Sequence, residues 1–372
     1  MKDRALLIVV SILLGLAVIF CTTSLSRDPA QSADQSQNPL EAPHSTQATD
    51  TPAVQHALSS TPLRQIAQRD KLIALLDPKD RESIFKVVDA IQNDPAIVDD
   101  CHEMAHDIGR QAYEYYGFSD AMTFDNPNHV KHALVQNICA GGYMHGVEEA
   151  LSAHEPGFLE KPELVCDQVP AADRASCFHG MGHVFMLAND RDADAAILGC
   201  RVIEWASDRY RCFEGVRMEQ FWGGAASLSS PVLGWDPKAP LSTCESARED
   251  ERPTCFLYST FGYLRVHPKD YTGAAALCAK SGLNDSDDHF CLKGLGMTMM
   301  SKFKGQSMEN SEMYATDLSL AEKYSFYEGV LGYAHLSGLS NAQLGDVCGL
   351  LKGDSLVCLD ALSLNEAAEA AQ

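Results

Sequence analysis

The most constraining feature of this sequence is a regular spacing of cysteines. Ten of them form five close pairs, and the two members of a pair stand 10 to 13 residues apart. The first members of successive pairs are separated by 34, 44, 34 and 70 residues, and the last interval is close to twice the first. A fixed period of about 35 residues is typical of a helical repeat array. The pairs are Cys166/Cys177, Cys200/Cys212, Cys244/Cys255, Cys278/Cys291 and Cys348/Cys358.

One further repeat unit is hidden in the long interval between Cys278 and Cys348. Met313 and Phe326 stand 13 residues apart where its two cysteines would be, so apolar residues have replaced that pair. A short phrase also recurs, as CAGGYMHG, CFHGMGHV, CFEGVRME and CLKGLGMT, with glycine three residues after its cysteine. Glycine is unfavourable inside a helix, so its recurrence predicts close backbone contact between neighbouring helices.

Turn-forming residues lie between the cysteines of each pair, which predicts two helices joined by a turn and a disulfide. Each bridge would close a short loop and contribute about 3 kcal/mol to stability. Cys101 and Cys139 are left over, and we pair them by elimination. Metal thiolates are the alternative, but the pairs lack the C-x2-C spacing that zinc sites favour.

These pairs, with the C-x-x-G phrase, resemble the cysteine-rich relatives of tetratricopeptide repeats. In those proteins each helix pair is stapled by one disulfide, and the resemblance covers residues 164–364. It implies export to an oxidising compartment and says little about function. We therefore predict an all-α fold, an α-solenoid of about six to seven disulfide-stapled helix-turn-helix repeats.

The N-terminal segment predicts membrane anchoring. Residues 1–21 hold an uncharged apolar run that starts at Ala5 and follows Lys2 and Arg4, which is typical of a signal anchor or a signal peptide. No A-x-A cleavage site follows, so we favour an uncleaved anchor. Residues 22–61 are rich in Ser, Thr, Gln and Pro and predict a flexible linker. Residues 62–372 would form the repeat domain, facing the periplasm or the extracellular space.

Some of the 13 histidines fall in matching positions of the repeats. Counted from the cysteine of the recurring phrase, the second, sixth and ninth positions share one helical face. Equivalent positions of neighbouring repeats line up in a solenoid, so polar residues on this face should converge. Leaving them buried without partners would cost about 1 to 3 kcal/mol each, which requires a metal or a hydrogen-bond network. The face carries His145, Glu148, His179, His183 and Glu214, with Glu219 at its edge.

A second histidine pair lies upstream, in the phrase CHEMAHDIG. On a helix, H-E-x-x-H places His102 and His106 on one face, where both can bind one zinc ion. The phrase resembles the zincin metallopeptidase motif, which implies that His102 and His106 are metal ligands and that Glu103 is the catalytic base. No histidine follows at the place of the third metzincin ligand, and Glu148 or Glu149 could take that role.

Together the two clusters predict one transition-metal site within residues 101–219. Imidazole and carboxylate ligands suit zinc or iron, and copper with nearby methionines is the alternative. The candidate ligands are more numerous than the four that one tetrahedral ion binds. The site could therefore hold two metal ions, or one metal ion with further residues that transfer protons. The candidate ligands are His102, His106, His145, Glu148, His179, His183, Glu214 and Glu219.

These features predict an exported, membrane-anchored metal-dependent enzyme, hydrolytic or oxidative. A non-catalytic metal-binding or storage protein is one alternative, and a protein-interaction solenoid with a buried polar network is another. The formal net charge of −22 argues against a nucleic-acid partner, because phosphate recognition needs a clustered cationic surface. The expected partners are the membrane, through the N-terminal helix, and a protein; the sequence names no substrate.

Overall fold

The structure is a computed structural model of the whole chain. It describes residues 63–93, 101–122, 139, 141–169, 171–222, 236, 238–279, 285–303, 312, 314–336 and 339–369. The predicted anchor (1–21) and linker (22–61) lie outside these ranges. Within them the regular structure is helical, apart from one isolated bridge between Asp77 and Asp80, so the predicted all-α class is confirmed there. None of the described helices combines the length and apolar character of a membrane span.

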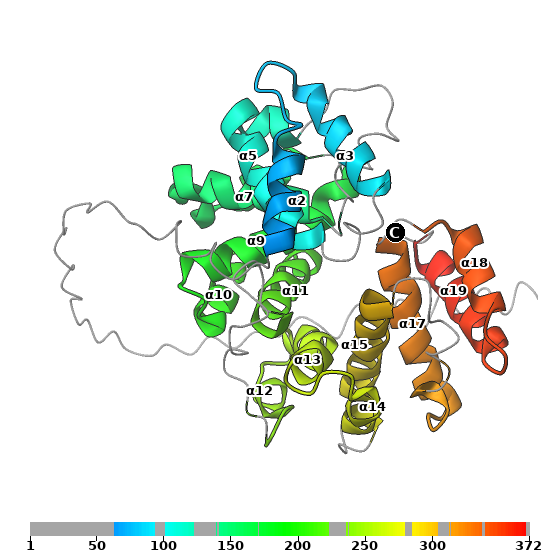
Figure 1. Cartoon of the computed structure of the whole chain (residues 1–372). Helices are drawn as coiled ribbons and strands as arrows, with labels where there is room; N and C mark the ends of the chain where they lie inside the picture. The colour runs from blue at the N-terminus through cyan, green and yellow to red at the C-terminus, as the bar shows by residue number, and fades with distance from the viewer. Residues whose placement is uncertain are drawn as a thin grey trace, which may run out of the picture. The chain divides into compact units, whose positions relative to one another are not determined.

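Long helices dominate the domain, and each packs against the next one along the chain (Figure 1). Most of their apolar residues pack into the core between helices and are buried. In order they are α5 (Cys101–Met122), α7 (Gly142–His154), α9 (Arg174–Ala188), α11 (Ala206–Trp222), α13 (Arg252–Val266), α15 (Asp285–Phe303), α17 (Leu320–Leu336) and α19 (Ser355–Glu369).

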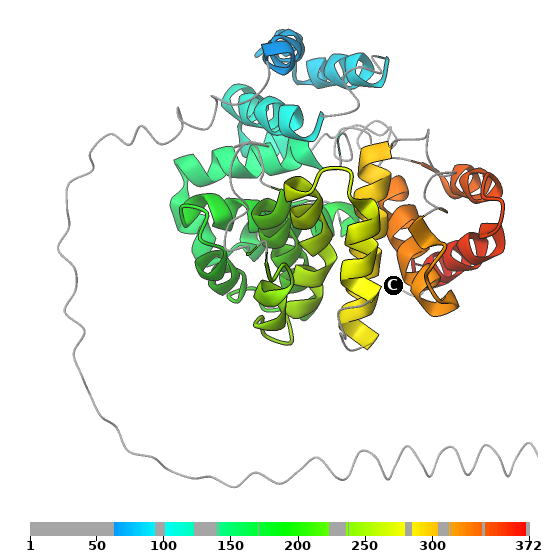
Figure 2. The same cartoon turned by 60° about the horizontal axis from the view of Figure 1, so that its bottom comes forward.

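Short helices alternate with the long ones, and each contacts the long helix that follows it. They are α8 (Glu163–Cys166), α10 (Ala193–Cys200), α12 (Ser242–Glu245), α14 (Tyr271–Ala279) and α18 (Asn341–Gly349). At the N-terminal end, α2 (Leu63–Ile73) and α3 (Ile84–Asn93) form a helix pair beside α5, in blue in Figure 2. The 3-10 segments are Arg81–Ser83, Pro156–Glu160 and Ala171–Asp173.

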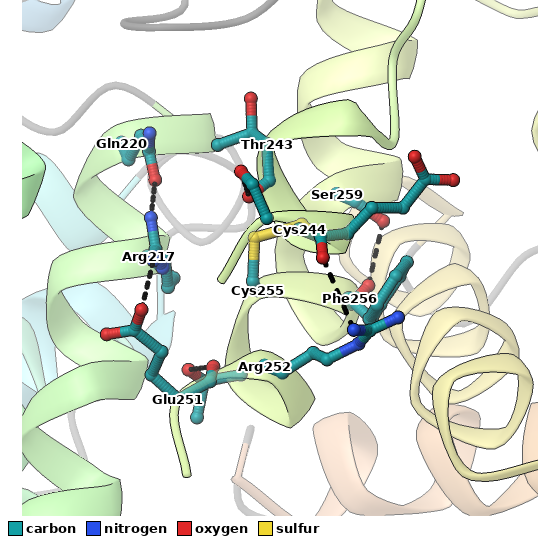
Figure 3. The surroundings of a disulfide bond; sticks show 12 residues. Arg217, Gln220, Thr243, Cys244, Glu251, Arg252, Cys255, Phe256 and Ser259 are labelled. Carbon is teal, nitrogen blue, oxygen red and sulfur yellow. Dashed lines mark hydrogen bonds and ion pairs between the residues drawn. A yellow bond between two sulfur atoms is a disulfide. The ribbon is translucent and has the colours of Figure 1, made fainter. Parts of the chain in front are cut away.

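Six disulfides are present, five between the pairs that the spacing predicts and one between Cys101 and Cys139, which were paired by elimination. The first cysteine of each close pair lies in a short helix, and the second lies in the N-terminal half of the next long helix. Figure 3 shows one of these bridges, Cys244–Cys255, beside the ion pair of Arg217 with Glu251. Phe326, in the unit without cysteines, is fully buried in α17, whereas Met313 lies outside the described residues. The bridges are Cys101–Cys139, Cys166–Cys177, Cys200–Cys212, Cys244–Cys255, Cys278–Cys291 and Cys348–Cys358.

The recurring glycines lie where neighbouring long helices touch, as their recurrence predicts. A Cβ atom at Gly142, Gly215, Gly294 or Gly329 would overlap a main-chain carbonyl oxygen of the preceding long helix. Side chains therefore do not separate these helices at the contact points, and the main chains approach each other directly. Gly180 is different, because a Cβ atom there would overlap the carboxylate of Glu148.

Candidate metal centre

Five histidines from three consecutive long helices form one cluster. The centroids of neighbouring rings lie between 4.8 and 6.2 Å apart. The three central side chains, His106, His145 and His183, are only 1 to 3 % exposed, and the other two are partly buried. The structure thus brings together the histidines selected from the sequence: His102 and His106 on α5, His145 on α7, and His179 and His183 on α9.

His102 and His106 stand one helical turn apart on α5, and their Nε2 atoms lie 3.2 Å from each other. The Nδ1 atom of His102 donates to the carbonyl of Cys139 at 2.7 Å. The Nδ1 atom of His106 faces Oε1 of Glu149 at 2.8 Å and donates to that carboxylate. A neutral imidazole has one protonated nitrogen, so in the neutral rings both Nε2 atoms carry lone pairs.

Two features of Cys139 fix the position of its carbonyl group beside His102. Its backbone has φ 57°, a left-handed conformation that residues other than glycine rarely adopt. Its side chain is fixed to Cys101, the residue before His102, by a disulfide. Cys139 thus combines a covalent tie to α5 with a hydrogen bond that sets the orientation of the His102 ring.

His145 on α7 completes the first group of ligands. Its ring is inclined by 70° to that of His102 and by 68° to that of His106. One nitrogen of each of these three rings can be chosen so that all three lie within 4.8 Å of one another. Both ring nitrogens of His145 are buried without a hydrogen-bond partner.

His183 and His179 on α9 form a second group with His145, again with ligand atoms within 4.8 Å of one another. The Nδ1 atom of His183 lies 3.2 Å from Oε2 of Glu219 on α11, and its Nε2 atom is buried without a partner. The Nε2 atom of His179 lies 3.3 Å from the sulfur of Met218. Two imidazoles of the cluster, His106 and His183, are therefore each oriented by a glutamate of the following helix.

The two orienting carboxylates are themselves paired with arginines. Burial alone would raise the pKa of Glu149, but His106 and Arg110 beside it hold that pKa well below its usual range. Burial likewise opposes the ionisation of Glu219, but the hydrogen bond from His183 and the charge of Arg191 lower its pKa. Both groups are thus carboxylates at neutral pH and hold a proton on the outer nitrogen of the histidine they contact.

Burial lowers the pKa of His102, His145 and His179 well below that of a free imidazole, and the neighbouring histidines lower it further. These rings are therefore neutral at pH 7. Metal ions bind the neutral imidazole, so no proton has to leave these three rings before a nitrogen lone pair can coordinate.

Glu148 and Glu214 have different surroundings from Glu149 and Glu219. Glu148 is fully buried, and neither of its oxygens has a hydrogen-bond partner. It packs against Gly180 and lies near the sulfurs of Cys166 and Cys177, which are joined in a disulfide and cannot act as thiolate ligands. Burial raises the pKa of Glu148 well above its usual range. Glu214 pairs with Arg211 at 2.8 Å, on its own helix.

Glu103 lies in the first turn of α5, but its side chain is outside the part of the chain that the structure describes. Two neighbours of the cluster were not in the set of eight candidate ligands. Glu149 was considered only as a third metal ligand, and the structure places it on the outer nitrogen of His106. Trp222, at the end of α11, stacks on His102 at 6.1 Å, and no spacing in the sequence indicated this contact.

Comparison with protein-family models, with curated proteins and with solved structures finds no match. The chemistry of the cluster therefore rests on its own geometry. Imidazole groups of this kind fit a transition metal ion such as zinc, iron or copper. Three imidazole ligands would leave a coordination position for water or a substrate, the usual composition of a catalytic site.

Proposed function

We propose that this protein is an exported helical-repeat metalloprotein and a metal-dependent enzyme. His102, His106 and His145 would hold the metal ion, zinc or iron. His183 lies on the same cluster and presents a buried nitrogen without a partner. The arrangement favours hydrolytic over oxidative chemistry, since three imidazoles with an open position suit the activation of water.

The facing Nε2 atoms of His102 and His106 carry this proposal. Their outer nitrogens are committed to acceptors, so in neutral rings two lone pairs face each other across 3.2 Å in a largely buried site. Such an arrangement is repulsive unless a proton or a metal ion lies between the nitrogens, and metal content distinguishes the two. Two nitrogens bound tetrahedrally to one zinc ion, each about 2.0–2.1 Å from it, would be about 3.3 Å apart. The separation in the structure is close to that value.

The residues of the chain have separate tasks in the proposed reaction. A zinc ion in this site would lower the pKa of its bound water to near neutrality. Glu149 keeps the outer nitrogen of His106 protonated, so that Nε2 remains free to coordinate. Glu103 is the proposed base that accepts the proton of the water, by its place in the H-E-x-x-H phrase.

The remaining proposals concern architecture and location. Long helices that pack in chain order, with short helices between them, support an α-solenoid of the cysteine-rich tetratricopeptide type. Six disulfides support a protein of an oxidising compartment, the periplasm or the extracellular space. Residues 1–21 would anchor it to the membrane.

Metal content of the purified full-length protein tests the proposal. We expect at least about one equivalent of transition metal per chain after reconstitution, and a large loss in a His106→Ala variant. His154→Ala is the matched control, since His154 also pairs with a glutamate, Glu114, but at an exposed site. Reconstituted protein that holds no metal would contradict the proposal and leave an interaction solenoid with a buried polar network.

Catalysis is tested on the metal-loaded protein with ester, phosphoester and peptide substrates. We expect hydrolysis that disappears on chelation and returns with metal. A Glu103→Gln variant should keep the metal and lose most of this activity, because it removes the base without removing a ligand. Full metal content without any activity would instead indicate a storage or delivery protein.

A further inference from the structure

The histidine cluster consists of two ligand groups that share one residue. His102 and His106 form the first group with His145, and His179 and His183 form the second group with the same His145. We propose that the cluster holds two metal ions, with the imidazole of His145 bridging them through its two nitrogens. This inference rests on the proposed metal site and deepens it.

His145 differs from the histidines around it in its hydrogen bonds. A histidine that binds one metal ion normally donates its other ring N–H to a carboxylate or a carbonyl. His102, His106 and His183 follow this rule, with Cys139, Glu149 and Glu219 as the acceptors. His145 is 1 % exposed, and neither of its ring nitrogens has a hydrogen-bond partner.

A single metal ion would use only one of the two nitrogens of His145. The other would remain an N–H group buried without an acceptor, an unfavourable state for a polar group. A second ion removes this problem, since the N–H proton leaves and the nitrogen becomes a ligand. In this step one metal–nitrogen bond forms and one proton passes to solvent, with no change of oxidation state.

Donors for the second ion are present on α9, in the group that His179 and His183 form with His145. The Nε2 atom of His183 is buried without a partner. The Nε2 atom of His179 lies 3.3 Å from the sulfur of Met218, so a thioether stands beside an imidazole at this position. Imidazole with thioether favours a softer ion than imidazole with carboxylate does, and copper fits this second group.

The two groups are not equivalent in geometry. The ring of His145 stands at 70° and 68° to those of His102 and His106, so the first group surrounds a point from different directions. It lies at only 23° and 30° to the rings of His179 and His183, which form a near-parallel stack with it. Rings in a stack must turn to direct their nitrogens at one ion. We therefore expect the second ion to bind more weakly than the first.

Stepwise titration of the metal-free full-length protein tests the stoichiometry. With zinc, and separately with Cu(II), we expect about two equivalents per chain, bound in two steps. His179→Ala should abolish the weaker step and keep the stronger one, whereas His154→Ala should keep both. Binding of one equivalent by the native chain would overturn the second ion while leaving the first site intact. Binding of none would overturn the proposed function itself, so the two failures are distinguishable.

Two further measurements test the bridge and the thioether. Electron paramagnetic resonance of the protein loaded with two Cu(II) ions should show magnetically coupled copper, because an imidazolate transmits exchange between its two metals. Two uncoupled signals would overturn the bridging role of His145. A Met218→Leu change, which nearly conserves volume, should weaken Cu(I) binding in the second step by about tenfold and leave zinc binding unchanged. Equal Cu(I) affinity in the two proteins would remove copper as the preferred second ion.

Discussion

The Nδ1 atom of His106 on α5 lies 2.8 Å from Oε1 of Glu149 on the next helix, α7. The same relationship recurs two long helices later, between His183 on α9 and Glu219 on α11. Each glutamate is held in turn by an arginine, Arg110 in the first case and Arg191 in the second. The helix pairs α5/α7 and α9/α11 thus supply similar Arg–Glu–His chains, and both chains direct an imidazole into the same cluster.

Glu149→Gln should weaken metal binding without unfolding the protein. The amide is of the same size, but it is neutral and can present its NH2 group to His106, so it no longer fixes the protonated Nδ1. Loss of such an outer partner typically costs 10- to 100-fold in metal affinity. Competition with a chromophoric chelator measures the change. Glu114→Gln, which alters the exposed pair with His154, should keep the native affinity, and an equal loss in both variants would refute the role of Glu149.

Removal of the Cys101–Cys139 disulfide should reduce stability and metal affinity together. The bridge fixes the turn whose carbonyl accepts the hydrogen bond of His102. The double change to alanine should cost on the order of 3 to 4 kcal/mol in the chain-entropy account, plus a weaker metal site. Removal of Cys244–Cys255 is the control, since that bridge lies outside the cluster and should affect only stability. Urea denaturation and the chelator competition separate the two effects.

The effect of a glycine-to-alanine substitution on stability should depend on which atoms lie opposite the added methyl group. Gly294→Ala would place a Cβ atom on the carbonyl oxygen of Leu257, a main-chain atom that cannot turn aside, and we expect destabilisation by about 1 to 3 kcal/mol. Gly332→Ala on α17 meets nothing within 4 Å and should be neutral or stabilising by up to about 1 kcal/mol. Urea midpoints measure both. Similar changes at the two sites would show that the helices do not depend on main-chain contact.

The metal-free protein should lose stability as the pH falls below about 6.5, the ordinary pKa of histidine. Burial lowers the pKa of His102, His145 and His179 in the folded state, so the unfolded chain binds more protons in this range. The stability that these three neutral histidines contribute is fully present above about pH 6.5 and is lost as the pH falls below it. Glu148 has a raised pKa in the folded state and therefore favours folding as the pH falls, but it is one group against three histidines.

Urea denaturation of the chelated protein between about pH 7.5 and about pH 5.5 measures this dependence. A His145→Gln variant carries one fewer of these groups and should show a shallower slope. Stability that stays constant or rises toward pH 5.5 in the native chain would contradict neutral, buried histidines.

The disulfide framework could be predicted from the sequence because the cysteine spacing is a one-dimensional signal. A separation of 10 to 13 residues leaves room for a turn between two helices, and this places the two cysteines together, as in Cys166–Cys177. The convergence of His145, His179 and His183 followed from the same repeat register, whereas His102 and His106 were selected by the spacing of the H-E-x-x-H motif. Both kinds of signal are local spacings that the sequence contains in full.

The positions of the glutamates could not be predicted in this way. Register places a residue on a helical face, but it does not say which neighbour fills the opposite space. Glu148 and Glu149 are adjacent in sequence and point in directions about 100° apart on a helix. The carboxylate of Glu148 fills the place that a side chain at Gly180 would take, whereas Glu149 contacts Arg110 and His106. Glu214 was assigned to the cluster by register, but Arg211 on the same helix pairs with it.

Contact between α5 and α7 has a consequence for the choice of ion. Gly142 and Gly146 lie so close to α5 that a Cβ atom at either would overlap the carbonyl oxygens of His102 and His106, the ligand residues themselves. The separation of α5 and α7 is therefore set by main-chain contact, which cannot repack as side chains do. If the cluster holds a metal ion as proposed, we expect this fixed separation to disfavour ions of larger radius than zinc.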